Sequence, residues 1–278
     1  MNTAEFTAIV WFGSLLAGFL GALTGLGGGV VIVPLLTLAF HVDLKYAIGA
    51  ALVSVIATSS GAAAAYVREG YSNVRVGMFL EIATTIGALA GAGLALYLKA
   101  SVIAVIFGLV LIYSAYTSLR PQPHDSIKQK PDRLATWLRM DSTYPTEHGL
   151  ESYHVSGIPL GFALMFVAGV LSGLLGIGSG AVKVLAMDKA MKLPFKVSTT
   201  TSNFMIGVTA AASAGIYLSR GYIDPGLAMP VMLGVLIGSL SGARVLAGAN
   251  VRILRIVFSS VIGALALEMI YSGITGRI

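Results

Sequence analysis

Long apolar runs separated by short polar connections make up most of the chain. The runs that approach the length of a membrane span lie at roughly 8–25, 47–67, 76–98, 101–119, 157–176, 198–218, 226–246 and 251–274. A helix needs about 20 apolar residues to cross a hydrocarbon core of about 30 Å, because it rises only about 1.5 Å per residue. The pattern therefore predicts a helical protein that crosses a membrane several times.

Two further apolar runs are too short to cross. The runs 30–40 and 180–191 hold 11 and 12 residues, about 18 Å of helix. Each follows a glycine cluster, Gly25-Leu-Gly-Gly-Gly29 or Gly176-Ile-Gly-Ser-Gly180. Short, glycine-interrupted segments at matching positions of two halves are typical of transporter binding sites. We therefore predict two re-entrant hairpins whose tips lie near the membrane midplane.

The second half of the chain repeats the first. A shift of 151 residues brings the cluster 25–29 onto 176–180 and Tyr66 and Tyr71 onto Tyr217 and Tyr222. Many matches at one offset indicate an internal duplication. The sequence thus divides into a first membrane repeat, a polar connecting loop and a second membrane repeat, at 1–119, 120–156 and 157–278.

The positions of Lys and Arg indicate how the halves are oriented. If each hairpin enters and leaves on one side, each half crosses three times and the second half is inverted. Of the 18 basic residues, 14 then fall on one side and 4 on the other, whereas parallel halves give 9 and 9. The positive-inside rule favours inversion, with the 120–156 loop cytoplasmic and both termini outside. If each hairpin instead crossed the membrane completely twice, the second half would still be inverted. The charge count therefore determines the inversion better than the depth of the hairpins.

The predicted fold class is therefore an all-α polytopic membrane protein. It consists of two inverted repeats, each a glycine-tipped re-entrant hairpin followed by three transmembrane helices. Composition agrees, because 56% of the residues are hydrophobic and only 11% are charged, less than half of the about 25% typical of soluble domains.

Composition also excludes several chemistries. The absence of cysteine rules out disulfides, thiolate metal sites and cysteine nucleophiles. Three of the four histidines lie in one polar stretch, and no Ser–His pair falls at membrane depth, so we expect no metal, no cofactor and no enzymatic activity. The net charge is +6, but the basic residues form no stripe on a soluble domain, so we expect no nucleic-acid partner.

The glycine clusters are the first candidate site. Backbone N–H groups at the starts of the short helices could bind an anion with help from the helix dipole. The alternative is that small residues allow close helix packing. The candidate substrate-binding residues here are Gly27, Gly28, Gly29, Gly178, Ser179 and Gly180.

Lys183 follows Gly180 by three residues, and its counterpart in the first half is Ile32. A lysine near the midplane is costly and suggests a functional role, here as a substrate-binding cation. The alternative is a side chain that reaches along the helix to the cytoplasmic surface.

A run of hydroxyl and amide side chains, Ser198-Thr-Thr-Thr-Ser-Asn203, opens the next helix, whereas its counterpart at 47–52 is apolar. Helix capping is one role for such residues. Six in a row exceed that need, so we expect some of them to donate hydrogen bonds to an anion. The candidates are Thr200, Thr201, Ser202 and Asn203.

Two acidic residues, Glu81 and Glu268, lie within apolar runs. Either could carry protons in a coupled transporter, or pair with an arginine such as Arg75 or Arg244. The sequence does not choose between these roles.

The glycine motifs resemble the duplicated signature of the sulfite exporter TauE/SafE family. They read Gly25-Leu-Gly-Gly-Gly29 with Val33-Pro34, and Gly176-Ile-Gly-Ser-Gly180 with Lys183-Val184. The segment from Met191 to Ser213 is similar to one branch of that family. The resemblance covers nearly the whole chain and implies a transporter of small sulfur oxyanions or organosulfonates, usually assigned to export. Ser179 and Leu185 depart from it, because the family often has glycine and proline there.

We therefore predict a secondary transporter, acting as an exporter, that binds a small anion such as sulfite or an organosulfonate between the two tips. The alternatives are an anion channel and a transporter of another small oxyanion or a carboxylate. The expected location is the cell membrane, plasma or inner, with several passes through the lipid bilayer. The sequence leaves open whether the protein forms a homo-oligomer.

Overall fold

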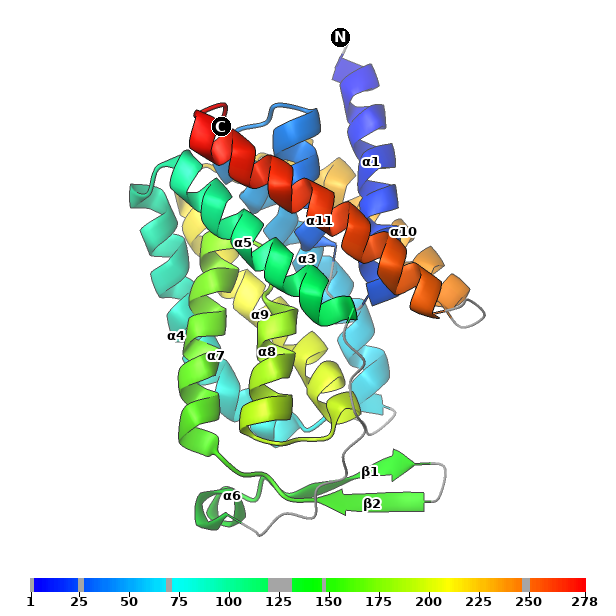
Figure 1. The fold of residues 1–278 in the computed structure, drawn as a ribbon, viewed down its shortest axis with the longest axis vertical. Helices are drawn as coiled ribbons and strands as arrows, with labels where there is room; N and C mark the ends of the chain where they lie inside the picture. Colours follow the sequence, from blue (N-terminus) through cyan, green and yellow to red (C-terminus); the bar gives the residue numbers. More distant parts are fainter. Residues whose placement is uncertain (1–2, 25–27, 69–71, 120–131, 147–148, 247–250) are drawn as a thin grey trace.

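A bundle of long helices forms the body of the protein (Figure 1). The computed structural model describes residues 3–24, 28–68, 72–119, 132–146, 149–246 and 251–278. The first half contains the helices α1 (Thr3–Thr24), α2 (Gly29–Pro34), α3 (Leu44–Arg68), α4 (Val74–Tyr97) and α5 (Ala100–Leu119), with a π-helical turn η1 (Leu35–Ala39) after α2. The second half contains α7 (Ile158–Leu175), α8 (Gly180–Leu185), the π-helical turn η2 (Ala186–Ala190), α9 (Phe195–Ser219), α10 (Pro225–Leu246) and α11 (Val251–Thr275).

The two halves share one pattern of elements. Adding 151 to the bounds of α2, η1 and α3 gives the bounds of α8, η2 and α9 residue for residue. The same shift carries the first residues of α4 and α5 onto those of α10 and α11.

Helix packing is reciprocal between the halves. The main pairs are α1 with α10, α4 with α7, α3 with α9 and α5 with α11. Because α7 corresponds to α1 and α10 to α4, the first two pairs are the same pairing with the halves exchanged. The first helix of each half therefore packs against the helix of the other half that corresponds to α4.

Glycines allow the α4–α7 pair to approach closely. A Cβ atom on Gly87 or Gly91 of α4 would overlap the carbonyl oxygen of Phe166 or Val170 on α7. A Cβ on Gly169 of α7 would overlap the backbone of α4 in the same way. Without side chains at these positions the two backbones can lie in direct contact, as small residues permit in membrane helices.

The lengths and the outer surface of the helices suit a membrane. Among the described residues, three helices are long and apolar enough to cross one, Val74–Tyr97, Ala100–Thr117 and Ile158–Leu175. Five shorter apolar helical stretches accompany them, Glu5–Phe19, Gly29–Ala39, Leu44–Ser60, Pro225–Ser241 and Ser259–Thr275. Large apolar side chains project from the outside of the bundle, each more than half exposed, among them Phe12, Met78, Leu109, Leu240 and Leu267.

The segment between the halves forms a small unit that the sequence analysis does not predict. It contains a short helix α6 (Arg133–Trp137) and an antiparallel hairpin of β1 (Ser142–Thr146) and β2 (Gly149–Tyr153). The hairpin lies at one end of the bundle, whereas the start of α1 and the C-terminus lie at the other (Figure 1).

Candidate functional site

The second half places α7, α8 and η2 in a closed hairpin. The backbone N–H of Ser156, just before α7, donates to the carbonyl oxygen of Met191, just after η2, at 3.2 Å. The segment therefore returns to the end from which it started. Its tip turns at Gly176, Gly178 and Ser179, which have φ angles of 70°, 69° and 45°. Glycine adopts this left-handed region without strain, whereas the Cβ atom of Ser179 makes the same conformation sterically unfavourable.

The first half forms a corresponding hairpin. The ring of Phe6 in α1 packs edge-on against that of Phe40, just after η1, with centroids 5.9 Å apart. The predicted site residue Gly27 lies outside the described residues, whereas Gly28 and Gly29 are described and buried. Both hairpins thus have their two ends on one side.

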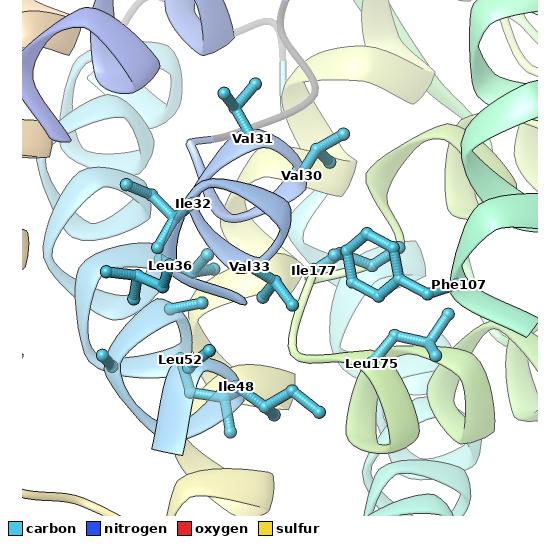
Figure 2. Packing of buried hydrophobic residues seen from close by; sticks show 14 of the residues in the cluster. Val30, Val31, Ile32, Val33, Leu36, Ile48, Leu52, Phe107, Leu175 and Ile177 are labelled. Atoms are coloured by element: carbon cyan, nitrogen blue, oxygen red, sulfur yellow. The ribbon is translucent and has the colours of Figure 1, made fainter. Parts of the chain in front are cut away.

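The tips of the two hairpins meet. A Cβ atom on Gly29 would lie 3.0 Å from the carbonyl oxygen of Gly176 and 3.5 Å from Cα of Ile177. Figure 2 shows Ile177 with Val33 of the first hairpin and Phe107 of α5 in one buried apolar cluster. The structure therefore brings together the two glycine motifs, which are 151 residues apart in the chain.

Close packing accounts for the glycines in this conformation. A Cβ on Gly178 or Gly180 would press into the side chain of Ile206, at 2.7 and 2.8 Å. The hydroxyl of Ser179 donates to the carbonyl oxygen of Ala168 at 2.6 Å and thereby holds the tip against α7. The glycines of the tip therefore serve close packing, the alternative considered in the sequence analysis. Any role in anion binding would be additional to this packing role.

A polar network lies among α4, α8 and α9. The ammonium group of Lys183 donates to the hydroxyl of Thr209 at 2.5 Å. That hydroxyl lies 2.7 Å from Oε1 of Glu81, to which it can donate. Thr85, one turn along α4, donates to the same carboxylate oxygen at 3.2 Å. We call these residues the Lys183–Thr209–Glu81 network.

The charged groups of the network are buried. The exposed fraction of Lys183 is 0% and that of Glu81 is 8%. Among the residues that the structure describes, these are the only charged side chains in the buried class. Lys183 therefore does not reach along its helix to the surface. Of the two roles left open for Glu81, pairing with Arg75 is not the one seen, because Arg75 donates to the carbonyl oxygen of Arg139 at 3.1 Å, outside the bundle.

The polar run that opens α9 divides between two faces. Ser202 faces the hairpin and donates to the carbonyl oxygen of Gly180 at 3.3 Å. Thr201 faces α4 and accepts a hydrogen bond from the backbone N–H of Asn73 at 2.9 Å. Thr200 donates back to Lys196 of its own helix at 3.0 Å, and Asn203 is half-buried. Ser202 thus connects this run to the hairpin tip.

Comparison with known proteins identifies the family to which the chain belongs. The family model described as "Sulfite exporter TauE/SafE" matches residues 10–269. The chain belongs to the TauE/SafE family. It is 28% identical to the "Probable membrane transporter protein YunE" of Bacillus subtilis (strain 168), over 97% of this chain and 99% of that protein. It is also 25% identical to the "Probable membrane transporter protein MJ0441" of Methanocaldococcus jannaschii, over 92% of each. No solved structure matches the chain.

This TauE/SafE protein is therefore a multi-pass membrane transporter. Its relatives are named as transporters rather than as enzymes.

Thr209 is the site residue that sequence reasoning missed. It stands alone in the apolar part of α9, outside the run 198–203. The signal that could have found it is helical spacing, because Ser202, Thr209 and Ser213 are separated by seven and four residues and so share one face. Extending the polar run along that face would have led to Thr209.

The second predicted acid, Glu268, lies apart from this network. It is exposed on α11, where it accepts a hydrogen bond from Ser272 at 3.4 Å. The side chain of Arg244, its suggested partner, lies outside the described residues. The structure thus distinguishes the two acidic residues, one enclosed beside a lysine and one on the outer surface.

An open apolar groove of about 700 Å³ lies on the outside, between α1 and α10. Its lining includes Trp11, Phe12, Met229 and Leu233, and none of the lining residues belongs to the network. A groove without charged groups on an apolar outer face suits lipid tails better than a small anion.

Asn73 joins the β-hairpin unit to the bundle and was also missed. Its side-chain amide donates to the carbonyl oxygen of Met140 and to the hydroxyl of Tyr153, both at 2.8 Å. Its side-chain oxygen accepts from the backbone N–H of Val76 and caps α4. Burial raises the pKa of Tyr153 to about 12, so this phenol stays protonated near neutral pH.

We expect Asn73→Ala to detach the β-hairpin unit from the bundle. The change removes the donor to the buried carbonyl oxygen of Met140, at a cost of about 1–3 kcal/mol, and takes away one hydrogen bond of the Tyr153 hydroxyl. Limited proteolysis should then cut within 132–157 faster than in the unaltered protein. The exposed Thr143 of β1 provides the matched control Thr143→Ala, and equal cleavage rates in the two variants would contradict the assignment.

Proposed function

We propose that this protein is a secondary transporter of small sulfur-containing anions such as sulfite or organosulfonates, and that it acts as an exporter in the cell membrane. The observation that carries the proposal is the fully buried ammonium group of Lys183 beside the meeting hairpin tips. A lysine enclosed in a membrane bundle is costly and is usually retained for a ligand or an ion pathway.

The surroundings of Lys183 suit a small oxyanion. Ser202 supplies a hydroxyl beside Gly180 at the tip, and Lys183 lies one helical turn further along α8. An oxyanion needs several donors to replace its water, and one ammonium group with nearby hydroxyls provides them. The tips leave little space between Gly29 and Gly176, which favours a ligand of few atoms that enters when the tips separate.

Inverted halves would give the site access to both sides in turn. Support comes from the directions of equivalent helices, because α1 begins at the upper end of the bundle and α7 at the lower end in Figure 1. The distribution of basic residues, 14 against 4, supports a cytoplasmic position for the 120–156 segment. In such transporters one repeat moves against the other around a fixed site.

Single cysteines test this orientation without background, because the chain has none of its own. We expect Lys189→Cys to be labelled by an impermeant maleimide only from the cytoplasm, and Ser219→Cys only from outside. Both positions are exposed and lie at opposite ends of the α9 region. Met191→Cys is unsuitable, because Met191 is fully buried. Labelling of both cysteines from the same side would rule out the inverted arrangement.

Substrate flux tests the function itself. Proteoliposomes would be offered sulfite, sulfate, thiosulfate, sulfoacetate and chloride, with and without a pH gradient. We expect uptake of at least one sulfur anion to be accelerated by the same anion loaded on the opposite side, because a carrier exchanges its substrate. Unitary currents without such acceleration would support the anion channel instead. Transport of chloride alone would refute the proposed substrate class.

A further inference from the structure

The buried charges of the network balance each other. Lys183 contributes one positive charge and Glu81 one negative charge, and Thr209 links them through its hydroxyl. An unpaired charge in the interior of a membrane protein is strongly unfavourable. The enclosed state seen here is therefore stable because Glu81 acts as a counter-anion to Lys183.

A substrate anion would disturb this balance. If it bound to Lys183 while Glu81 kept its negative charge, the enclosed site would hold two negative charges and one positive charge. Neutrality is restored when Glu81 accepts a proton, since its carboxylate becomes a neutral acid. For a monovalent anion, the enclosed charge is then zero both before and after binding.

We propose that Glu81 and the substrate anion occupy Lys183 alternately, and that Glu81 binds a proton whenever the anion replaces it. One proton then moves with each monovalent anion, in the same direction. This inference rests on the proposed function, because it requires that an anion reaches Lys183.

The hydrogen bonds around Glu81 suit this exchange. A hydroxyl has a single proton, and Thr209 has two acceptors within reach, Oε1 of Glu81 at 2.7 Å and the carbonyl oxygen of Met205 at 2.9 Å. When Glu81 is neutral, Thr209 can donate along its own helix instead. Oε2 of Glu81 is buried and has no hydrogen-bond partner at the geometric limit among the described residues, so it can take up the added proton.

No other described charged group competes for this role. Glu81 lies on α4, which packs against α7 and α9. Besides Glu81 itself, the charged residues of α4, α7 and α9 are Arg75 and Lys196, and both are exposed. Tyr217 of α9 is buried, but its hydroxyl donates to the carbonyl oxygen of Gly173 at 3.2 Å. Asp188 pairs with Lys189 at 3.2 Å in η2, and Glu268 lies on the outer face of α11.

The test measures anion flux and proton movement in the same proteoliposomes. The probes are methanesulfonate and thiosulfate, which bind no protons near neutral pH, and a trapped pH dye reports the protons. The unaltered protein should move about one proton with each methanesulfonate, as charge neutrality requires. Glu81→Gln keeps an acceptor for Thr209 and Thr85 but cannot titrate. In net uptake, where a coupled carrier must move protons, we expect this variant to take up the anion more slowly than the unaltered protein and with a proton-to-anion ratio near zero.

Two further variants complete the comparison. Glu268→Gln makes the same chemical change in another membrane helix and should keep the ratio of the unaltered protein. Glu81→Asp retains a titratable group and should keep coupling at a lower rate, which provides a second test if Glu81→Gln does not fold. Anion flux without protons in the unaltered protein, coupling that survives Glu81→Gln, or coupling lost only in Glu268→Gln would overturn the inference. Absence of flux for both probes and for the sulfur anions offered in the flux assay above would instead refute the proposed function, and the inference with it.

Discussion

Lys183→Gln is expected to lower anion flux by about a hundredfold or more while the protein still inserts into the membrane. Helix N-termini at the hairpin tips offer only about half a unit of positive charge each. A full charge 4 Å from the anion contributes about 4 kcal/mol at an effective dielectric constant near 20. Removing that contribution should reduce substrate capture far more than removing any single hydroxyl.

The charge of Glu81 complicates this substitution and also provides its control. In Lys183→Gln the carboxylate of Glu81 lacks its cationic partner, which itself destabilises a buried site. The double variant Lys183→Gln/Glu81→Gln is neutral again and should assemble like the unaltered protein, yet it should still not transport. If the double variant regained flux, the loss in the single variant would be due to charge imbalance rather than to lost anion binding.

Two more lysine variants show whether the effect depends on the charge and on its position in the chain. Lys183→Arg keeps the charge but changes donor geometry and size, so we expect partial transport. Lys192 is exposed on the connection before α9, and Lys192→Gln should have little effect because solvent and salt screen its charge. Flux and the monodispersity of the detergent-extracted protein would be measured for each variant. Normal flux in well-folded Lys183→Gln would show that the anion does not bind at this lysine.

The course of the helices could be predicted from the sequence because hydrophobic length is a local property. The predicted run 198–218 became α9 at Phe195–Ser219, three residues longer at its start and one at its end. The short helices after the glycine clusters were also predicted, since both the glycines and the missing length are visible in the sequence.

The polar contacts could not be predicted, because they depend on how helices distant in the chain come together. Thr209 looks like an ordinary membrane threonine until α4 and α8 place Glu81 and Lys183 on either side of it. Asn73 looks like a helix cap, which it is, but its bonds to Met140 and Tyr153 require the folded β-hairpin unit. A candidate site inferred from residue type therefore identified the charges but missed the residues that connect them.

Gly91→Ala and Gly93→Ala should differ sharply in stability, although they are the same change two residues apart in α4. A Cβ on Gly91 would overlap the carbonyl oxygen of Val170, and backbone atoms cannot rotate away. Around Gly93 no atom lies within 4 Å of such a Cβ. Gly91→Ala must therefore force α4 and α7 apart, at a cost of about 1–3 kcal/mol or more.

At Gly93 the added methyl group enters open space, and alanine is better than glycine in a helix by about 1 kcal/mol. Gly93→Ala should therefore match or exceed the unaltered protein in thermal stability, measured as the temperature at which the monodisperse peak is lost on heating in detergent. Gly91→Ala should lose that peak at a clearly lower temperature. It should also transport poorly, because a displaced α4 carries Glu81 away from Thr209. Equal melting of the two variants would mean that α4 and α7 are not in backbone contact.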